Sequence, residues 1–196
     1  MVAIIIEPAY SECMWGKSLL NSLTRCLKQK RIPFCIVDDS LLTKYDGVFV
    51  IGTNYNWLKA VLLTFNASGI KPILLCNQTE NIAGCSYCSV GSDVSDSMQS
   101  LLKKLSKNGK SRIALYGVNT DSVSDIGRKN ELLTLQGDYL TSVHTFKNSG
   151  SLKECFNSFY SMRENFDAVI CSNDLVAVSL IRNLKRQSPG TLKNLE

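Results

Sequence analysis

The sequence predicts an α/β fold built from parallel sheets, and three observations lead to this prediction. Short apolar runs rich in Val and Ile alternate along the chain with amphipathic segments of helix length. The runs are continuous rather than alternating in polarity, which is typical of strands covered on both faces. The alternation occurs twice, once in each half of the chain. We therefore expect two doubly wound parallel-sheet lobes, an N-terminal lobe at 1–91 and an incomplete C-terminal lobe at 92–196.

The apolar runs give the expected strands one by one. They lie at 2–6, 34–37, 47–51, 72–76, 111–117 and 167–172, with weaker candidates near 86–91 and 141–146. Helical patterns lie between them, at about 14–30, 55–68, 93–108, 124–136, 151–164 and 174–186. The segment 77–93 is polar, contains glycine and has little helix signal, so we expect it to connect the two halves.

The composition argues against a direct nucleic-acid-binding surface, a membrane-spanning segment and a signal peptide. The chain has 196 residues, 44% of them hydrophobic and 20% charged, which is ordinary for a soluble globular protein. Its net charge of +5 is spread out, without the basic stripe of a direct nucleic-acid surface. No apolar segment reaches the ~20 residues that span a bilayer, and "MVAIIIEPAY" lacks the basic region and cleavage site of a signal peptide.

The cysteines favour a reducing, cytoplasmic compartment. Of the eight, several lie inside apolar strand or helix patterns, where a free thiol behaves as a small buried hydrophobe: Cys26, Cys35, Cys76 and Cys171. Cys85 and Cys88 form "CSYC", but a structural zinc site needs four ligands and no second pair follows at a suitable spacing. We expect no metal, no cofactor and no disulfide framework.

The motifs of common enzyme classes are absent. The first strand is not followed by Gly-x-Gly-x-x-Gly, and no Gly-x-x-x-x-Gly-Lys-Ser/Thr occurs, which argues against dinucleotide and P-loop enzymes. A catalytic triad would have to use His144, the single histidine, which we expect to be a half-buried surface residue. We therefore expect a protein that is not an enzyme and has no catalytic residues.

The segment "SVSDIGRKNELL" at 122–133 leaves a strand and enters a helix. Ser122, Ser124 or Asp125 can cap that helix, and Arg128 lies one turn after Ser124 on the same face. With the free N–H groups of the first turn, these side chains can form a polar cup at the carboxyl end of a strand. The alternative is an ordinary capped helix with a solvated arginine.

Asn173 and Asp174 occupy the same position after the strand "DAVIC". Either residue can be a simple N-cap, but capping needs one side chain, and the second is then free to bind the vicinal hydroxyls of a ligand. Asn77 ends "PILLCN" as a third group of this kind, and Trp15 offers a ring face to a sugar or a base. A lone tryptophan is more often simple packing.

Taken in order, several segments resemble the effector-binding domain of the lactose/galactose repressor (LacI/GalR) family of bacterial transcription regulators, a fold shared with periplasmic sugar-binding proteins. They are "VAIII", "YDGVFVIG", "KPILLCN", "SDVSDSMQSLLKKLSKNGKSRIALYG", "SVSDIGR" and "FDAVICSNDLVAVSLIRNL". The resemblance covers essentially the whole chain, and "DAVICSND" together with Arg128 is its most specific part. Asn77 stands where many relatives have Asp.

The resemblance implies which residues bind a ligand and what binding does. It implies a small-molecule effector, a carbohydrate, held in the cleft between lobes by Trp15, Asn77, Ser124, Arg128, Asn173 and Asp174. Hinge motion of the lobes then couples effector binding allosterically to DNA, in a cytoplasmic homodimeric repressor without membrane contact. Family members contact DNA through a helix-turn-helix before the first strand and continue past this C-terminus, so we expect a partial chain that lacks both parts.

Two other functions stay open at this stage. A solute-binding protein of a sugar transporter would share the fold, but it needs an export signal and tolerates eight cysteines poorly. An α/β transferase could use Asp174 or Asp93, but it would need a phosphate-binding loop or paired carboxylates, and the sequence shows neither.

Overall fold

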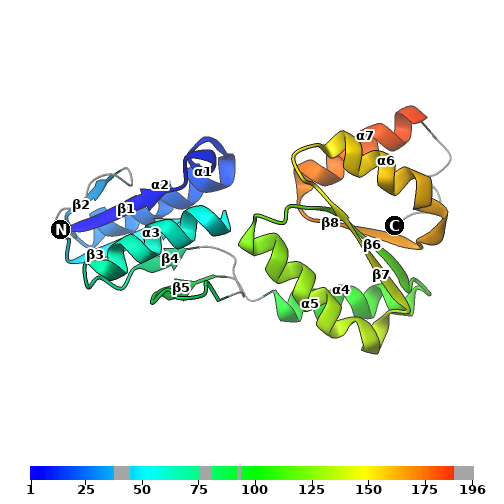
Figure 1. Cartoon of the computed structure of the whole chain (residues 1–196), viewed down its shortest axis with the longest axis horizontal. Helices are drawn as coiled ribbons and strands as arrows, with labels where there is room; N and C mark the ends of the chain where they lie inside the picture. The colour runs from blue at the N-terminus through cyan, green and yellow to red at the C-terminus, as the bar shows by residue number, and fades with distance from the viewer. Residues whose placement is uncertain (38–44, 76–80, 92–93, 188–196) are drawn as a thin grey trace. The chain divides into compact units, whose positions relative to one another are not determined.

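The computed structural model describes residues 1–37, 45–75, 81–91 and 94–187, and these form two compact units. The first unit is Met1–Ser92 with the segment Asp121–Ser124, and the second is Asp93–Thr120 with Asp125–Glu196. Each unit has a parallel sheet with helices on both faces (Figure 1). The predicted α/β class with parallel sheets is therefore confirmed.

The first unit contains a five-stranded parallel sheet in the order β2-β1-β3-β4-β5. Its strands are β1 (Val2–Ile6), β2 (Phe34–Ile36), β3 (Gly47–Ile51), β4 (Ile73–Leu75) and β5 (Cys88–Val90). Its helices are α1 (Pro8–Glu12), α2 (Met14–Gln29) and α3 (Tyr55–Ala67). The central strands β1 and β3 are the most apolar, as expected for strands covered on both faces.

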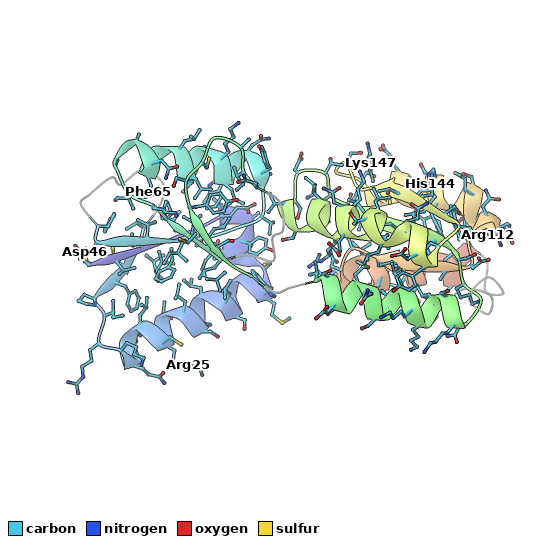
Figure 2. All side chains as sticks on the ribbon, turned by 90° about the horizontal axis from the view of Figure 1, so that it is seen from below. Arg25, Asp46, Phe65, Arg112, His144 and Lys147 are labelled. Carbon is cyan, nitrogen blue, oxygen red and sulfur yellow. The ribbon has the colours of Figure 1, made fainter. Side chains whose placement is uncertain are left out.

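Successive residues of β1 pack into two different cores of this unit, one on each face of the sheet. Ile4 packs with Leu27 of α2 on one face of the sheet. Ala3 and Ile5 point to the opposite face and pack with α3, for example with Leu62. Figure 2 shows the two helices on opposite sides of the strands.

The second unit contains a three-stranded parallel sheet in the order β7-β6-β8. Its elements are α4 (Ser95–Lys107), β6 (Arg112–Val118), α5 (Val123–Tyr139), β7 (Ser142–Lys147), α6 (Leu152–Met162), a 3-10 turn (Arg163–Asn165), β8 (Ala168–Cys171) and α7 (Asp174–Gln187). Helices α4 and α5 cover one face and α6 and α7 the other (Figure 1). Helix α5 begins in the segment that belongs to the first unit.

Two short elements carry little signal in the sequence. Pro8–Glu12, expected as loop, forms the single-turn helix α1, which begins with Pro at its first position and buries no residue. β5 confirms the weaker strand candidate near 86–91, but it is only three residues long, and all three are exposed. Both elements lack the apolar periodicity by which helices and strands are recognised in sequence.

An ion pair joins the amino-terminal end of β6 to the start of β8. The guanidinium of Arg112 donates to Asp167, with Nη2 at 2.6 Å from Oδ1, and the backbone N–H groups of Arg112 and Ser111 donate to Oδ2 at 3.0 and 3.3 Å. The Arg112 guanidinium and these two amides lower the pKa of the Asp167 carboxyl to about 2, although partial burial opposes the shift.

Asp167→Asn is expected to destabilise the second unit at neutral pH and to lose this effect in acid. A lowered carboxyl pKa stabilises the fold above the unfolded value of about 3.9, and the contribution disappears as pH falls through the folded value. We expect the free energy of unfolding to fall by about 1 kcal/mol at neutral pH. The effect is this small because Arg112 is half exposed and solvent screens the pair. Urea unfolding between pH 2 and 6 checks this, with the exposed Asp138→Asn as control. If the unchanged protein and Asp167→Asn differed in free energy of unfolding by the same amount at every pH in this range, the result would contradict the ion pair.

Candidate functional site

Strands β6 and β8 bring their carboxyl ends together in the second unit. Tyr116 and Cys171 are paired neighbours in the parallel register, so the residues that follow both strands leave the same edge of the sheet. Ser172 fixes this edge, since its N–H donates to Tyr116 O at 3.0 Å and its hydroxyl donates to Gly117 O at 2.9 Å. Open α/β sheets bind their ligands at such carboxyl edges.

Arg128 is held at this edge by two different elements. Its Nη1 donates to Asp125 Oδ1 at 3.2 Å, one turn earlier in α5, and to the backbone oxygen of Ser172 at 3.1 Å. Asp125 Oδ2 accepts the backbone N–H of Asn119 at 3.0 Å, in the loop that follows β6. Asp125 therefore connects Arg128 to the loop after β6 at the start of α5.

Burial changes the acidity of Asp125. The residue is 8% exposed, and its loss of solvent raises the pKa of the carboxyl above the ordinary value. The Asn119 amide and the Arg128 guanidinium oppose this shift without cancelling it. The Arg128 side chain is 31% exposed, so the cation remains accessible to a ligand while one of its nitrogens is occupied.

Asn173 and Asp174 have different roles in the structure. Asn173 Oδ1 accepts the backbone N–H of Val176 at 2.9 Å, which is the hydrogen bond of an N-cap. Asp174 is the first residue of α7, and its side chain is exposed. The cap reading is therefore correct for Asn173, and Asp174 is the acidic group left at the surface of this edge.

Two of the other predicted ligand residues, Ser124 and Trp15, lie within the described residues. Ser124 is 6% exposed and lies in the first turn of α5. Trp15 lies in the first turn of α2, is 42% exposed and packs edge-to-face with Tyr10 at 5.3 Å. Asn77 lies outside the described residues. The structure thus joins Arg128 to the β8 end that carries Asn173 and Asp174, and it places Trp15 in the first unit.

Glu7 is a buried polar residue that the sequence analysis missed. It follows β1 directly, is 9% exposed, and its Oε2 accepts the backbone N–H groups of Thr53 at 2.7 Å and Asn54 at 3.0 Å. The available signal was an acidic residue at the end of the most apolar run in the sequence. A buried carboxylate requires hydrogen-bond donors, and here the backbone N–H groups of the turn after β3 supply them.

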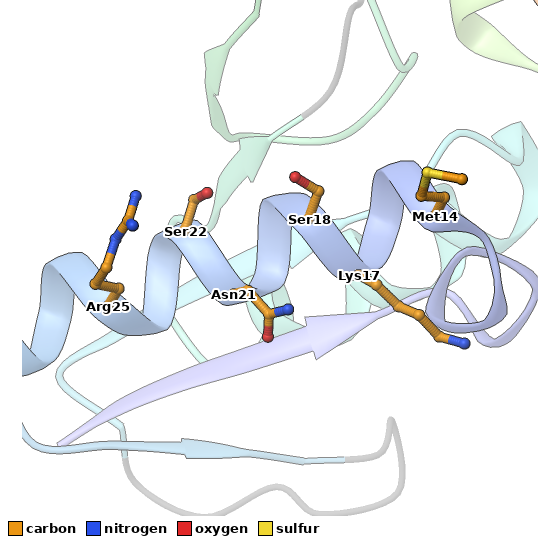
Figure 3. A pocket seen from close by; sticks show the side chains of 6 residues that line it. All are labelled: Met14, Lys17, Ser18, Asn21, Ser22 and Arg25. Carbon is orange, nitrogen blue, oxygen red and sulfur yellow. The ribbon is translucent and has the colours of Figure 1, made fainter.

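Two surface hollows contain none of the predicted ligand residues. One, of about 430 Å³, runs along α2 and is lined by Met14, Lys17, Ser18, Asn21, Ser22 and Arg25 (Figure 3). The other, of about 510 Å³, lies between α6 and α7 and includes Lys153 and Arg186. The first is the exposed side of one helix, so its side chains do not converge on a common point.

The cysteines and the histidine form no reactive cluster in the described parts of the chain. Seven of the eight cysteines are described, and all are free thiols. Burial raises the pKa of Cys171 to about 11 and also raises that of Cys155, so both stay protonated at neutral pH. His144 lies on β7, exposed rather than half-buried, with its ring 4.6 Å from Phe146 (Figure 2). Within the described residues, no three or more His, Cys, Asp or Glu side chains gather to hold a metal.

No described helix has the length and apolar character needed to cross a membrane.

No known family model and no curated protein matches the sequence. Solved structures do match its fold, although the sequence identities are low. The chain has the fold of the type I periplasmic binding proteins.

Three of the similar structures show which proteins share this fold. A LacI-family transcriptional regulator from Mycobacterium smegmatis has a TM-score of 0.72 at 15% identity, over 96% of this chain and 73% of the other. The complex of transcriptional regulator CelR with cellobiose has 0.74 at 14%, over 99% and 65%. The binding protein of the arabinose ABC transporter from Shewanella sp. ANA-3, bound to L-arabinofuranose, has 0.65 at 16%, over 95% and 69%. The type I fold therefore occurs here among both regulators and transporter components.

Proposed function

We propose that the chain is the ligand-binding domain of a LacI-type transcriptional regulator and that its effector is a small carbohydrate. The observation that carries the proposal is Arg128, which Asp125 and the Ser172 backbone oxygen hold at the carboxyl edge of β6 and β8, the edge that also presents Asp174. The structural neighbours that bind arabinose and cellobiose support the choice of ligand class.

The chemistry of these two side chains suits a polyol. A guanidinium has five N–H donors in a planar fork, and Arg128 uses Nη1 for the protein, so other donors are available for ligand oxygens. A carboxylate such as Asp174 accepts hydrogen bonds from two neighbouring hydroxyls. Because Arg128 is already fixed, binding does not have to order it, and this lowers the entropic cost of binding.

The thiols favour a regulator over a transporter component. All seven described cysteines are free, and an oxidising periplasm is the compartment where thiols form disulfides. A cytoplasmic regulator keeps them reduced. Effector coupling to DNA through an attached helix-turn-helix, homodimer formation and ligand contacts of Trp15, Asn77 and Ser124 remain predictions of the proposal.

A thermal-shift screen tests the ligand class directly. The panel contains pentoses, hexoses, disaccharides, phosphorylated sugars and nucleobases. A ligand present at about a hundred times its dissociation constant adds about 2.7 kcal/mol to the stability of the folded state. We expect one class of sugar to raise the unfolding midpoint. A folded protein that no sugar stabilises, while a nucleobase does, would contradict the proposal.

Asp174→Asn and Arg128→Ala are each expected to weaken binding of the active sugar by about 10- to 100-fold. Each change removes a charged hydrogen-bonding group, which contributes about 1.5–3 kcal/mol. Titration calorimetry measures the affinities, with the exposed Arg182→Ala on α7 as the matched control. Asp174 is exposed, so its variant keeps the fold even if Arg128→Ala disturbs Asp125. Unchanged affinity in Asp174→Asn and Arg128→Ala alike would exclude this edge as the site.

A further inference from the structure

The hollow of about 510 Å³ between α6 and α7 lies entirely within the second unit (Figure 1). Two of its lining side chains are apolar: Phe156, which is 3% exposed, and Leu152, which is half-buried. The other six are polar and come from both helices: Lys153, Asn157, Ser179, Asn183, Arg186 and Gln187. Small-molecule sites in proteins combine apolar surface with a few polar groups in this way, in volumes of about 300–1,000 Å³.

The helical repeat places the polar side chains on facing sides of the two helices. Lys153 and Asn157 are four residues apart on α6, so they share one face of that helix. Ser179 and Asn183 share a face of α7 for the same reason, and Arg186 continues it one turn later. Other residues of both helices supply the apolar packing on the sheet, so this polar face is not needed to hold the helices in place.

The six polar side chains have no partner in the protein. Within the part of the chain that the structure describes, none of them forms a hydrogen bond or an ion pair. Arg112 and Arg163 of the same unit, by contrast, each pair with a carboxylate. Ser179 and Asn183 are half-buried, where polar groups usually bond to protein or to ordered water. Donors and acceptors on both sides of the hollow are therefore available to a ligand.

The hollow is positively charged. Lys153 comes from α6 and Arg186 from α7, and no acidic residue of the described chain lines the hollow. An arginine binds a phosphate through parallel N–H donors of its planar guanidinium, and a lysine adds a compact positive charge. A phosphate monoester carries nearly two negative charges at neutral pH, so its charge matches that of the two cations.

We propose that this hollow is a second binding site, separate from the carboxyl edge of β6 and β8, and that its ligand is a small phosphate monoester. Lys153 and Arg186 bind the phosphate oxygens. The side-chain amides of Asn157 and Asn183 both donate and accept hydrogen bonds, so they bind hydroxyl groups on the rest of the ligand. The site needs no residue of the first unit, and it does not depend on the function proposed for Arg128.

An NMR titration of isotope-labelled protein locates the site residue by residue. D-Ribose 5-phosphate should shift the backbone amide signals of Asn157 and Asn183 in a saturable way, and inorganic phosphate should shift the same signals with weaker affinity. D-Ribose, which lacks the phosphate, should leave them unchanged. Lys153→Gln and Arg186→Gln should each weaken binding of D-ribose 5-phosphate by about tenfold, because each change removes a charged hydrogen-bond donor. Both residues are exposed, so we expect these variants to keep the fold.

Lys185→Gln is the matched control, because Lys185 is an exposed lysine of α7 outside the hollow and its loss changes the net charge equally. Equal weakening in Lys185→Gln would show attraction to net charge alone and would overturn the proposal. Amide shifts at Asn157 and Asn183 that follow protein concentration instead of ligand would assign the hollow to a contact between two copies of the chain, and would also overturn it.

Arg128→Ala separates this site from the proposed sugar site. This variant should bind D-ribose 5-phosphate normally, whatever happens to its affinity for sugars. If Arg128→Ala loses binding of D-ribose 5-phosphate while Lys153→Gln and Arg186→Gln keep it, the phosphate ester occupies the carboxyl edge of the sheet and the second site does not exist. Failure of the sugar site alone would leave the amide shifts in the hollow unchanged.

Discussion

Gly117→Ala is expected to lower the stability of the second unit by about 3 kcal/mol and to shift the start of α7. Gly117 has φ +79°, a left-handed conformation that costs an alanine about 1–2 kcal/mol. A Cβ at this position would also lie 2.4 Å from Cγ1 of Val176, which requires movement of the backbone or of the valine. Overpacking of this kind costs about 1–3 kcal/mol more.

The same substitution is expected to weaken sugar binding. Val176 donates its N–H to Asn173 Oδ1, so a displaced Val176 disturbs the cap of α7 and the position of the adjacent Asp174. The carbonyl of Gly117 also accepts the hydroxyl of Ser172, whose backbone oxygen holds Arg128. Urea unfolding measures the loss of stability, and titration with the sugar identified in the screen measures the loss of affinity.

Gly109→Ala separates backbone strain from collision. Gly109 has φ +71°, but nothing lies within 4 Å of the position of its Cβ. Its variant should therefore show the strain alone, about 1–2 kcal/mol, with normal sugar affinity. Val176→Ala removes the side chain with which the new methyl group collides. In the double variant, Gly117→Ala should therefore cost less stability than it does alone. Equal losses in the Gly109 and Gly117 variants would show that the contact with Val176 is unimportant.

The fold could be predicted because its central strands carry a strong local signal. The apolar runs at 2–6 and 47–51 correspond residue for residue to β1 and β3, where burial on both faces excludes polar side chains. α1 escaped prediction because five residues provide no periodicity, and Pro8 is its single marker. β5 was weak in sequence for a similar reason, since its three residues are exposed.

The site was less predictable because its geometry depends on contacts far apart in the chain. Asn and Asp are equally good caps, so the sequence could not decide between Asn173 and Asp174; the bond from Val176 decides it. Arg128 meets Ser172 across 44 residues, and Glu7 meets Thr53 across 46. Such long-range pairs leave no pattern in a single sequence, whereas strands and helices do.

The second unit has an aromatic core whose centre is Phe159. This ring is fully buried and lies 5.4 Å from Tyr116 and 5.4 Å from Phe146, both edge-on, and it stacks with Phe166 at 6.2 Å. Edge-to-face aromatic pairs stabilise a core by more than the burial of their apolar area alone. Tyr116 and Phe146 belong to β6 and β7, so Phe159 fastens α6 to the sheet.

Phe159→Ala is therefore expected to destabilise the second unit by about 3–5 kcal/mol, the cost typical of a large cavity in a core. Each unit has its own core clusters, so we expect amide protection in β1 and β3 of the first unit to persist when β6 loses protection. Phe65→Ala is the matched control, because Phe65 is 3% exposed in the first core and its loss should give the opposite pattern. Equal loss of protection in both units of Phe159→Ala would mean that the two cores unfold together, and denaturant unfolding would then show a single transition.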